Sequence, residues 1–343
     1  MSTMPVLTIA IPTYNRAEDL ARLLSSLSAE LSESAEKIDI VICNNASTDH
    51  TREVVERFVA TRPYARAIHQ TANLGMDGNF CACAEHVKGE YFWLIGDDDL
   101  PMPGAIRALV ALLKSRQPDL LYMNSRWLPD IAVAASQELA SPLRVTDLSR
   151  EAFGRRVHVW TTFLSAMIIR RSELLDDRNS LRRFFGTNLS QMAWVMERLR
   201  EGSRFVHVQT PCVLATAGNT GGYAVVSVFG EHFPRIVRES LSGSSRQRRL
   251  ARAIVLRTML LYLPGLLWSL RMSRAGNFES ENIASALQPQ LGGHPLTSLL
   301  LLPISRAPKP VARLALRLSG AAGRMLSVAD RARQKLTSKE LIA

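Results

Sequence analysis

The sequence predicts an α/β fold in which a mostly parallel sheet carries helices on both faces. Three observations support this prediction. Short apolar, β-branched runs alternate with helix-periodic segments between residues 5 and 125. Polar clusters follow the ends of three of these runs, and the last third of the chain changes to a basic, helix-forming composition. The alternation is typical of parallel strands that are joined by right-handed helical crossovers.

The individual elements follow from periodicity and from end signals. The run Val6–Ile11 is β-branched and is closed by Pro12, and the leucines of Ala17–Leu31 recur at helical spacing. Ser47 or Asp49 is expected to cap the helix that follows it. Further strands are expected at Ile38–Cys43, Ala65–His69, Tyr91–Gly96 and Leu120–Asn124, and further helices around Val54–Val59, Asn79–Val87 and Pro103–Ser115.

Composition describes a globular protein with an uneven charge. The apolar fraction of 47% in 343 residues leaves little room for extensive disorder. Residues 1–239 hold 26 Lys+Arg against 27 Asp+Glu, whereas residues 240–343 hold 16 against 4, so all of the net charge of +11 lies in the last third. Such asymmetry indicates an anionic partner surface. The four cysteines form no CxxC pair, which favours buried thiols in a reducing cytosol over disulfides or zinc, and no secretory signal is evident.

Asp97, Asp98 and Asp99 follow the apolar run Tyr91–Gly96. Such a strand is normally buried on both faces of a parallel sheet, so its carboxyl end lies at the edge where open α/β sheets bind ligands. Three adjacent carboxylates repel one another unless a cation lies between them, and Mg²⁺ or Mn²⁺ takes carboxylate and phosphate oxygens. The triplet therefore predicts a metal site. The alternative is a solvated turn that caps the helix after Pro103.

Polar clusters end three of the predicted strands: Thr13–Arg16, Asn44–Asn45 and Asp97–Asp99. The carboxyl ends of parallel strands meet at one edge of a sheet, so these clusters are expected to converge. Their convergence favours a ligand that bears phosphate groups.

Four motifs in the same order carry a family resemblance: Pro12–Arg16, Asn44–Asp49, Asn73–Gly75 and Gly89–Tyr91 before the aspartates. With them the chain resembles family 2 glycosyltransferases over residues 5–125. The resemblance implies the GT-A fold, a nucleotide-sugar donor and inversion at the anomeric carbon. Residues 73–99 are most similar to bacterial O-antigen and surface-polysaccharide transferases of the abequosyl- and rhamnosyltransferase kind.

The resemblance also implies roles for individual residues. The family usually has an aspartate that accepts a hydrogen bond from the nucleotide base where this chain has Asn45, whose amide both accepts and donates. Asp97 is expected near the ribose and sugar, and Asp98 and Asp99 near the metal and diphosphate. Which of the three contact the metal stays open. The residues that the resemblance places beside the base and ribose are Pro12, Thr13, Tyr14 and Arg16.

Inversion needs a general base that takes the proton of the acceptor hydroxyl. The family carries an acid at the start of a helix in the region of residues 185–194, where this chain has none. His158 and His207 lie beside apolar neighbours, where a histidine is more often a core residue. The base therefore stays unassigned. The nearest acids, each better explained as part of a surface turn or a solvated helix face than as the base, are Asp176, Asp177 and Glu197.

The last hundred residues contain two apolar runs, Thr258–Leu270 and Leu296–Ile304. Both are too short to span a bilayer, and Pro264-Gly265 is expected to break a helix. Basic residues alternate with leucine and alanine after residue 308, as in helices that lie on a membrane surface. The alternative is a set of core helices whose arginines extend to solvent. Nucleic acid is the poorer partner, because no binding motif is present.

Three parts are therefore expected: residues 1–125 as the nucleotide-sugar-binding half, 126–240 as the acceptor-side half, and 241–343 as a membrane-associating region. The expected activity is sugar transfer, dependent on Mg²⁺ or Mn²⁺, from a nucleoside-diphosphate sugar to a polyprenyl-diphosphate-linked saccharide at the inner face of the cytoplasmic membrane.

Two other functions are considered. A catalytically decayed nucleotide-sugar-binding scaffold would explain the missing acid and Asn45. A sugar-phosphate nucleotidyltransferase is disfavoured, because Pro12–Arg16 stands where that class usually carries a glycine-rich loop.

Overall fold

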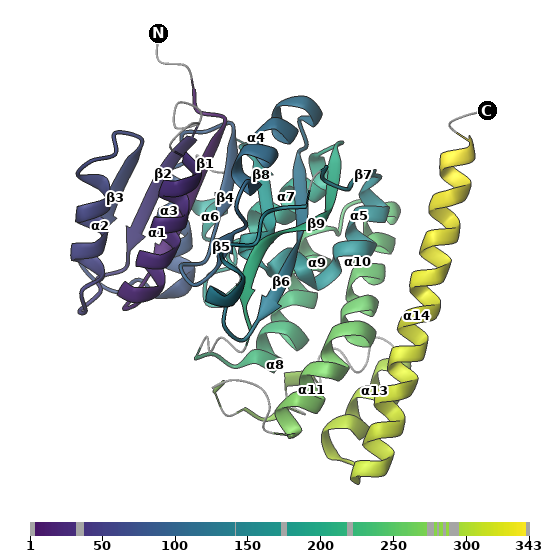
Figure 1. The fold of residues 1–343 in the computed structure, drawn as a ribbon. Coiled ribbons are helices and arrows are strands. Elements are labelled where there is room, and N and C mark those ends of the chain that lie inside the picture. The colour runs from purple at the N-terminus through teal and green to yellow at the C-terminus, as the bar shows by residue number, and fades with distance from the viewer. Residues whose placement is uncertain are drawn as a thin grey trace. The chain divides into compact units, whose positions relative to one another are not determined.

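The computed structural model of the chain describes residues 4–31, 38–140, 142–172, 177–217, 222–272, 278–279, 281–283, 286–287 and 295–340 (Figure 1). The chain forms two compact units. Unit 1 comprises Met1–Leu148 and Thr161–Ala217, and unit 2 comprises Ser149–Trp160 and Gly218–Ala343. These two units do not coincide with the three expected parts. Strand pairing joins residues 1–125 and 126–240 in one sheet, and the segment Ser149–Trp160 packs with the last part of the chain.

Unit 1 is built on a nine-stranded sheet with the order β3-β2-β1-β4-β8-β6-β9-β5, in which β7 also pairs with β9. The pairings make β1, β2, β3, β4, β6 and β9 run in one direction, so the expectation of a mostly parallel sheet is confirmed. The strands are β1 (Leu7–Thr13), β2 (Ile38–Asn44), β3 (Ala65–His69), β4 (Tyr91–Leu94), β5 (Leu100–Pro101), β6 (Leu120–Leu128), β7 (Val145–Leu148), β8 (Met167–Arg170) and β9 (Phe205–Thr216).

Helices cover both faces of this sheet. α1, α2 and α4 pack against the face that carries Leu7, Ile9 and Ile11. α3 and α7 lie on the opposite face, where the rings of Phe92 and Trp194 are 5.3 Å apart. The helices of unit 1 are α1 (Ala17–Leu31), α2 (Thr51–Val59), α3 (Gly75–Glu85), α4 (Ala105–Arg116), α6 (Arg178–Leu181) and α7 (Met192–Glu201), with short 3₁₀ turns at η2 (Ala132–Ala134) and η4 (Leu164–Ala166).

The central strands of unit 1 are buried along their whole length. All residues of β1, β2 and β4 are buried, and Trp93 donates its indole N–H to the Ser165 carbonyl at 3.0 Å. A strand that is covered on both faces has no face towards solvent, so apolar and polar residues need not alternate along it. This explains the continuous hydrophobic runs in the sequence. These rigid strands present the loops at their carboxyl ends in fixed positions.

Unit 2 is helical. Its elements are α5 (Arg150–Val157), α8 (Val225–Ser227), η6 (Val228–His232), α9 (Phe233–Ser240), α10 (Ser245–Arg257), η7 (Thr258–Tyr262), α11 (Leu263–Arg271), α13 (Pro295–Arg306) and α14 (Lys309–Glu340), and η3 (His158–Thr162) begins in it. A Cβ on Gly154 of α5 would lie 3.0 Å from Leu250 Cδ1, so α5 and α10 pack closely.

The prediction that Pro264-Gly265 breaks the helix is wrong. α10, η7 and α11 form one continuous helix from Ser245 to Arg271, in which the five residues Thr258–Tyr262 make a π-turn just before the proline. Proline has no N–H and its ring collides with the carbonyl one turn earlier, and a π-turn widens the helix at that point. Pro234 follows the π-turn η6 in the same way.

Both apolar runs of the last hundred residues pack in part within unit 2. Leu263 and Leu267 in the first run, and Leu301 and Ile304 in the second, are fully buried. Among the described residues, Ser245–Arg271 is the single helix whose length and apolarity would suffice to cross a bilayer, and half of its most apolar window is buried in the structure. These packed leucines fit the core-helix alternative for the two runs.

Candidate active site

Two of the predicted polar clusters are joined by hydrogen bonds. The Asn45 N–H donates to the Thr13 carbonyl at 3.0 Å, and the Thr48 N–H donates to Asn15 Oδ1 at 2.8 Å. The Ser47 hydroxyl accepts from the Asn15 N–H at 2.9 Å, and Asp49 accepts from the Thr51 N–H at the start of α2. The N-cap residue of α2 is His50, which makes no side-chain cap, so the expectation of a cap at Ser47 or Asp49 is wrong. The loops after β1 and β2 therefore form one structure.

The third cluster is joined to the first through Arg16. The Arg16 Nη1 lies 3.2 Å from Asp97 Oδ1 and 2.9 Å from Asp98 Oδ2. Arg16 comes directly before α1, and the aspartates follow β4, the neighbour of β1 in the sheet. The predicted convergence of three strand ends is thus present, with a guanidinium between two of the carboxylates.

Burial shapes the electrostatics of the aspartates. Burial raises the pKa of Asp97 to about 7, and the neighbouring Asp98 raises it as well, while Arg16 lowers it. Burial raises the pKa of Asp99 to about 7, again with a contribution from Asp98, while a hydrogen bond from Ser165 lowers it. Water solvates a carboxylate better than a protein interior does, so the charged form is disfavoured here until a cation approaches.

Asp99 is held by the second half of the domain. Its carboxylate accepts hydrogen bonds from the Ser165 hydroxyl and, at 3.2 Å, from the Thr216 N–H at the end of β9. The Ser165 hydroxyl in turn accepts from the Gly96 N–H at 2.9 Å. A Cβ on Gly96 would lie 3.1 Å from Asp98 Oδ1, so glycine gives these side chains room to fold back over the strand end.

The donor atoms around the strand end suit a hard divalent cation. Within the described part of the chain, no group of three or more His, Cys, Asp and Glu side chains is arranged to hold a metal. Asp97 and Asp98 nevertheless share Arg16 as their cation, and both offer carboxylate oxygens at one edge. Mg²⁺ and Mn²⁺ prefer one or two carboxylates plus phosphate oxygens. The residues therefore fit such an ion, which Asp97 and Asp98 would hold.

The residues assigned to the nucleotide differ in exposure. Tyr14 is 42% exposed, whereas Pro12 and Thr13 are buried beneath it. Asn45 is buried, and its amide is used by the next loop: it donates to Asn73 Oδ1 at 2.8 Å and accepts from the Leu74 N–H at 2.9 Å. In this structure Asn45 positions the 73–75 turn, and Tyr14 and Arg16 form the accessible surface.

The candidate bases do not gather at this edge. Glu197 is paired with Arg198 and contacts Ser172 at 3.4 Å, just beyond the end of β8 that pairs with the start of β4, so it lies at the opposite edge of the sheet. Asp177 is exposed and accepts from the Ser180 hydroxyl at 2.6 Å. Asp176 lies outside the described residues.

The two candidate histidines, His158 and His207, are core residues. His207 on β9 contacts Asn124 Oδ1 at 2.9 Å within the sheet. His158 belongs to unit 2, where burial and the nearby charge of Arg257 together lower its pKa to about 4. Both are buried side chains, as expected for core histidines.

Asp77 is a site residue that sequence reasoning missed. It lies in the first turn of α3, and its carboxylate accepts three backbone hydrogen bonds, from Thr187 at 3.1 Å, Asn188 at 3.0 Å and Ser190 at 3.0 Å. The segment without an acid therefore receives a carboxylate from a distant part of the chain. The sequence shows only an acid within an otherwise apolar helical segment, which does not reveal its distant backbone partners.

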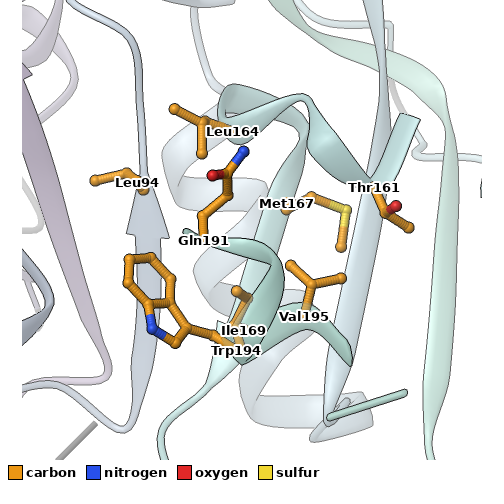
Figure 2. Close-up of a pocket in the computed structure, with 8 residues that line it drawn as sticks. All are labelled: Leu94, Thr161, Leu164, Met167, Ile169, Gln191, Trp194 and Val195. Atoms are coloured by element: carbon orange, nitrogen blue, oxygen red, sulfur yellow. The ribbon is translucent and has the colours of Figure 1, made fainter. Parts of the chain in front are cut away.

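A small pocket lies beside the strand end (Figure 2). Its lining residues are Leu94, Thr161, Leu164, Met167, Ile169, Gln191, Trp194 and Val195. Figure 2 shows the Gln191 carboxamide directed towards Leu164. Gln191 Oε1 and Trp194 Nε1 are buried, and neither has a hydrogen-bond partner within the described chain. Leu94 is the last residue of β4, so this largely apolar pocket borders the edge that carries the aspartates.

Comparison with known proteins gives the same class as the geometry. Residues 8–131 match the family Glycosyl transferase family 2. The abequosyltransferase RfbV of Salmonella typhimurium is 35% identical over 114 residues, which cover 32% of this chain and 33% of that protein. The hyaluronan synthase of Pasteurella multocida is 29% identical over 127 residues, which cover 37% of this chain and 13% of the synthase. The chain thus aligns with one third or less of these relatives.

Solved structures show the fold. S. aureus TarS 1–349 in complex with UDP superposes with a TM-score of 0.61 at 15% identity, over 93% of this chain and 91% of TarS 1–349. The mannosyltransferase PcManGT from Pyrobaculum calidifontis, in complex with GDP-Man and Mn²⁺, superposes with a TM-score of 0.52 at 18% identity, over 96% and 88% of the two chains. The fold is therefore the GT-A fold. Over residues 8–131 the chain is similar to family 2 glycosyltransferases, and in this region it resembles an O-antigen transferase.

The raised pKa values of Asp97 and Asp99 predict how stability depends on pH. The folded protein without added cation favours the protonated forms, so their stabilising contribution is complete below about pH 4 and is lost as pH rises through about 7. Chemical denaturation across this range should show the loss, and Asp97→Asn should remove part of it. Asp177→Asn, at an exposed position, is the control that keeps the wild-type slope. A wild-type stability that does not fall over this range would contradict the assignment.

Asp77→Ala should destabilise the 187–190 turn by about 3 kcal/mol, because three backbone N–H groups lose a charged acceptor. Denaturant unfolding measures the loss, and hydrogen exchange at these amides should accelerate. The control is Asp147→Ala, an exposed acid of unit 1 whose loss should stay within about 0.5 kcal/mol. Unchanged exchange at residues 187, 188 and 190 would contradict the anchoring role.

Proposed function

We propose that this protein transfers a sugar from a nucleoside-diphosphate sugar to a saccharide acceptor in the synthesis of a bacterial surface polysaccharide. The observation that carries the proposal is the convergence of three strand ends at the carboxyl edge of a GT-A sheet, where Arg16 pairs with Asp97 and Asp98 and the loops after β1 and β2 are hydrogen-bonded to each other. Ligands of open α/β sheets bind at this edge. The solved neighbours with UDP, UDP-GlcNAc and GDP-Man, and the similarity to an abequosyltransferase, support a nucleotide-sugar donor.

A divalent cation, Mg²⁺ or Mn²⁺, belongs to this proposal, and a neighbour with Mn²⁺ supports it. When bound, the ion neutralises the charge that develops on the departing nucleoside diphosphate. Asp97 and Asp98 would hold it, and Asp99 is kept in place by Ser165 and Thr216. Tyr14 and Arg16 form the accessible wall on the nucleotide side.

The acceptor side carries the finer part of the proposal. We infer inversion at the anomeric carbon, with a polyprenyl-diphosphate-linked saccharide as acceptor at the inner face of the cytoplasmic membrane. The similarity to an abequosyltransferase and the basic last third of the chain support this acceptor. The segment 187–191, anchored by Asp77 and followed by the pocket at Gln191, is the part of unit 1 that would face the acceptor.

The second candidate function is a nucleotide-sugar-binding scaffold without turnover. It is favoured by one observation. The Asp77 carboxylate accepts three backbone hydrogen bonds, and the described segment 187–191 contains no acidic residue. A turnover assay separates the two functions. The donor would raise the free energy of unfolding of a scaffold, but a scaffold would release no nucleoside diphosphate.

Asp98→Ala should lower the rate of nucleoside-diphosphate release from the donor by about 10²–10³-fold, because it removes a charged group beside the departing phosphate. A screen of nucleotide sugars with Mn²⁺ first identifies the donor, which at 100 times its dissociation constant adds about 2.7 kcal/mol to the free energy of unfolding. Asp147→Ala is the matched control that keeps full turnover.

The outcomes of this assay are distinct. Wild-type turnover that Asp98→Ala abolishes supports the transferase. Donor stabilisation without turnover by the wild type, across acceptors, supports the scaffold. Full turnover by Asp98→Ala contradicts the assigned site.

A further inference from the structure

The helix α14 (Lys309–Glu340) carries large apolar side chains on its exposed surface. They recur at intervals of three, four and seven residues, which places them on one side of the helix. We refer to these five residues as the outer stripe: Val311 is 48% exposed, Leu314 57%, Leu318 51%, Met325 74% and Val328 56%. Large apolar side chains are usually buried, and a contiguous exposed set of them marks an interaction surface.

Small residues make up much of the inner face of α14. Ala312, Ala315 and Ser319 are buried against the other helices of unit 2. Gly323 lies so close to Leu261 of η7 that an added Cβ would overlap that side chain. The large side chains Leu316 and Leu326 are partly buried, whereas the five residues of the outer stripe remain exposed and available to a partner.

The charges beside the outer stripe have one sign. Residues 309–330 contain four basic residues and one acid. Arg313, Arg317 and Arg324 are exposed, and the helical repeat places them along one margin of the stripe. The acid, Asp330, points inward, with Oδ2 3.0 Å from Arg257 Nε and Oδ1 3.0 Å from Arg155 Nε. The surface around the stripe is thus apolar and cationic.

We propose that the outer stripe of α14 docks on an anionic lipid bilayer. An apolar face flanked by arginines matches a membrane surface, where the side chains enter the acyl boundary and the guanidinium groups meet the headgroups. A second copy of the chain fits less well. Its α14 would place arginines against arginines, and Asp330 is already paired with Arg155 and Arg257. This inference names the surface that would contact the membrane, and it rests on the proposed function, in which the acceptor is lipid-linked.

The test uses the full-length protein and flotation with phosphatidylcholine vesicles, with and without phosphatidylglycerol. Leu318→Ser with Met325→Ser should lower binding to the anionic vesicles by about tenfold or more, because two side chains lose their apolar burial. Arg317→Gln with Arg324→Gln should lower it by about 25-fold at low salt, at about fivefold for each basic residue. The matched control is Met4→Ser with Val133→Ser, two exposed apolar residues of unit 1, which should bind like the wild type.

The substituted positions are exposed, so each variant is expected to fold, and thermal unfolding measures whether it does. Wild-type protein that stays unbound to anionic vesicles at low salt overturns the proposal, as does a stripe variant that binds like the wild type. A wild-type dimer by light scattering that the stripe variant converts to a monomer assigns the stripe to a second copy instead. Donor turnover without a lipid acceptor is measured in parallel, because failure of the proposed function abolishes turnover and leaves vesicle flotation unchanged.

Discussion

The buried carboxylates at the end of β4 are the constraint on which the rest of unit 1 depends. Asp97 and Asp99 are almost fully buried, and two such groups beside Asp98 are tolerated because other parts of the chain supply compensation. Arg16 gives a positive charge to Asp97 and Asp98, while Ser165 and Thr216 give hydrogen bonds to Asp99. The strand order of the sheet brings these donors together from residues far apart in the sequence. The site is therefore a property of the complete sheet.

Buried polar groups also connect other loops of unit 1. Asn45 holds the 73–75 turn, which leads into α3, and Asp77 in the first turn of α3 holds the segment 187–190. Each link is a buried polar group that would cost free energy if it lost its partner. Two sets of hydrogen bonds, joined by the first turn of α3, thus connect the loop after β2 with the segment before α7, beside the pocket at Gln191.

Much of this arrangement could be predicted from the sequence. Five strands, β1, β2, β3, β4 and β6, the helix Ala17–Leu31 and the convergence of the three polar clusters follow from periodicity and from the geometry of parallel sheets, and the structure contains all of them. The strands β5, β7, β8 and β9 were not predicted. Asp77 could not be predicted, because its partners are backbone groups more than a hundred residues away. The continuous helix through Pro264 could not be predicted either, since a π-turn leaves no mark in the hydrophobic pattern. The outer stripe needed the structure to show which face of α14 is covered.

The central claim is that Asp97 and Asp98 form the cation and diphosphate site of a nucleotide-sugar enzyme. Calorimetric titration of Mn²⁺ into the protein with a nucleoside diphosphate, near neutral pH and in buffers of different ionisation enthalpy, tests it most directly. The account predicts saturable binding with release of protons, because Asp97 and Asp99 have pKa values of about 7 before the cation arrives. Binding that is absent, or that is the same in Asp98→Asn, would contradict the account.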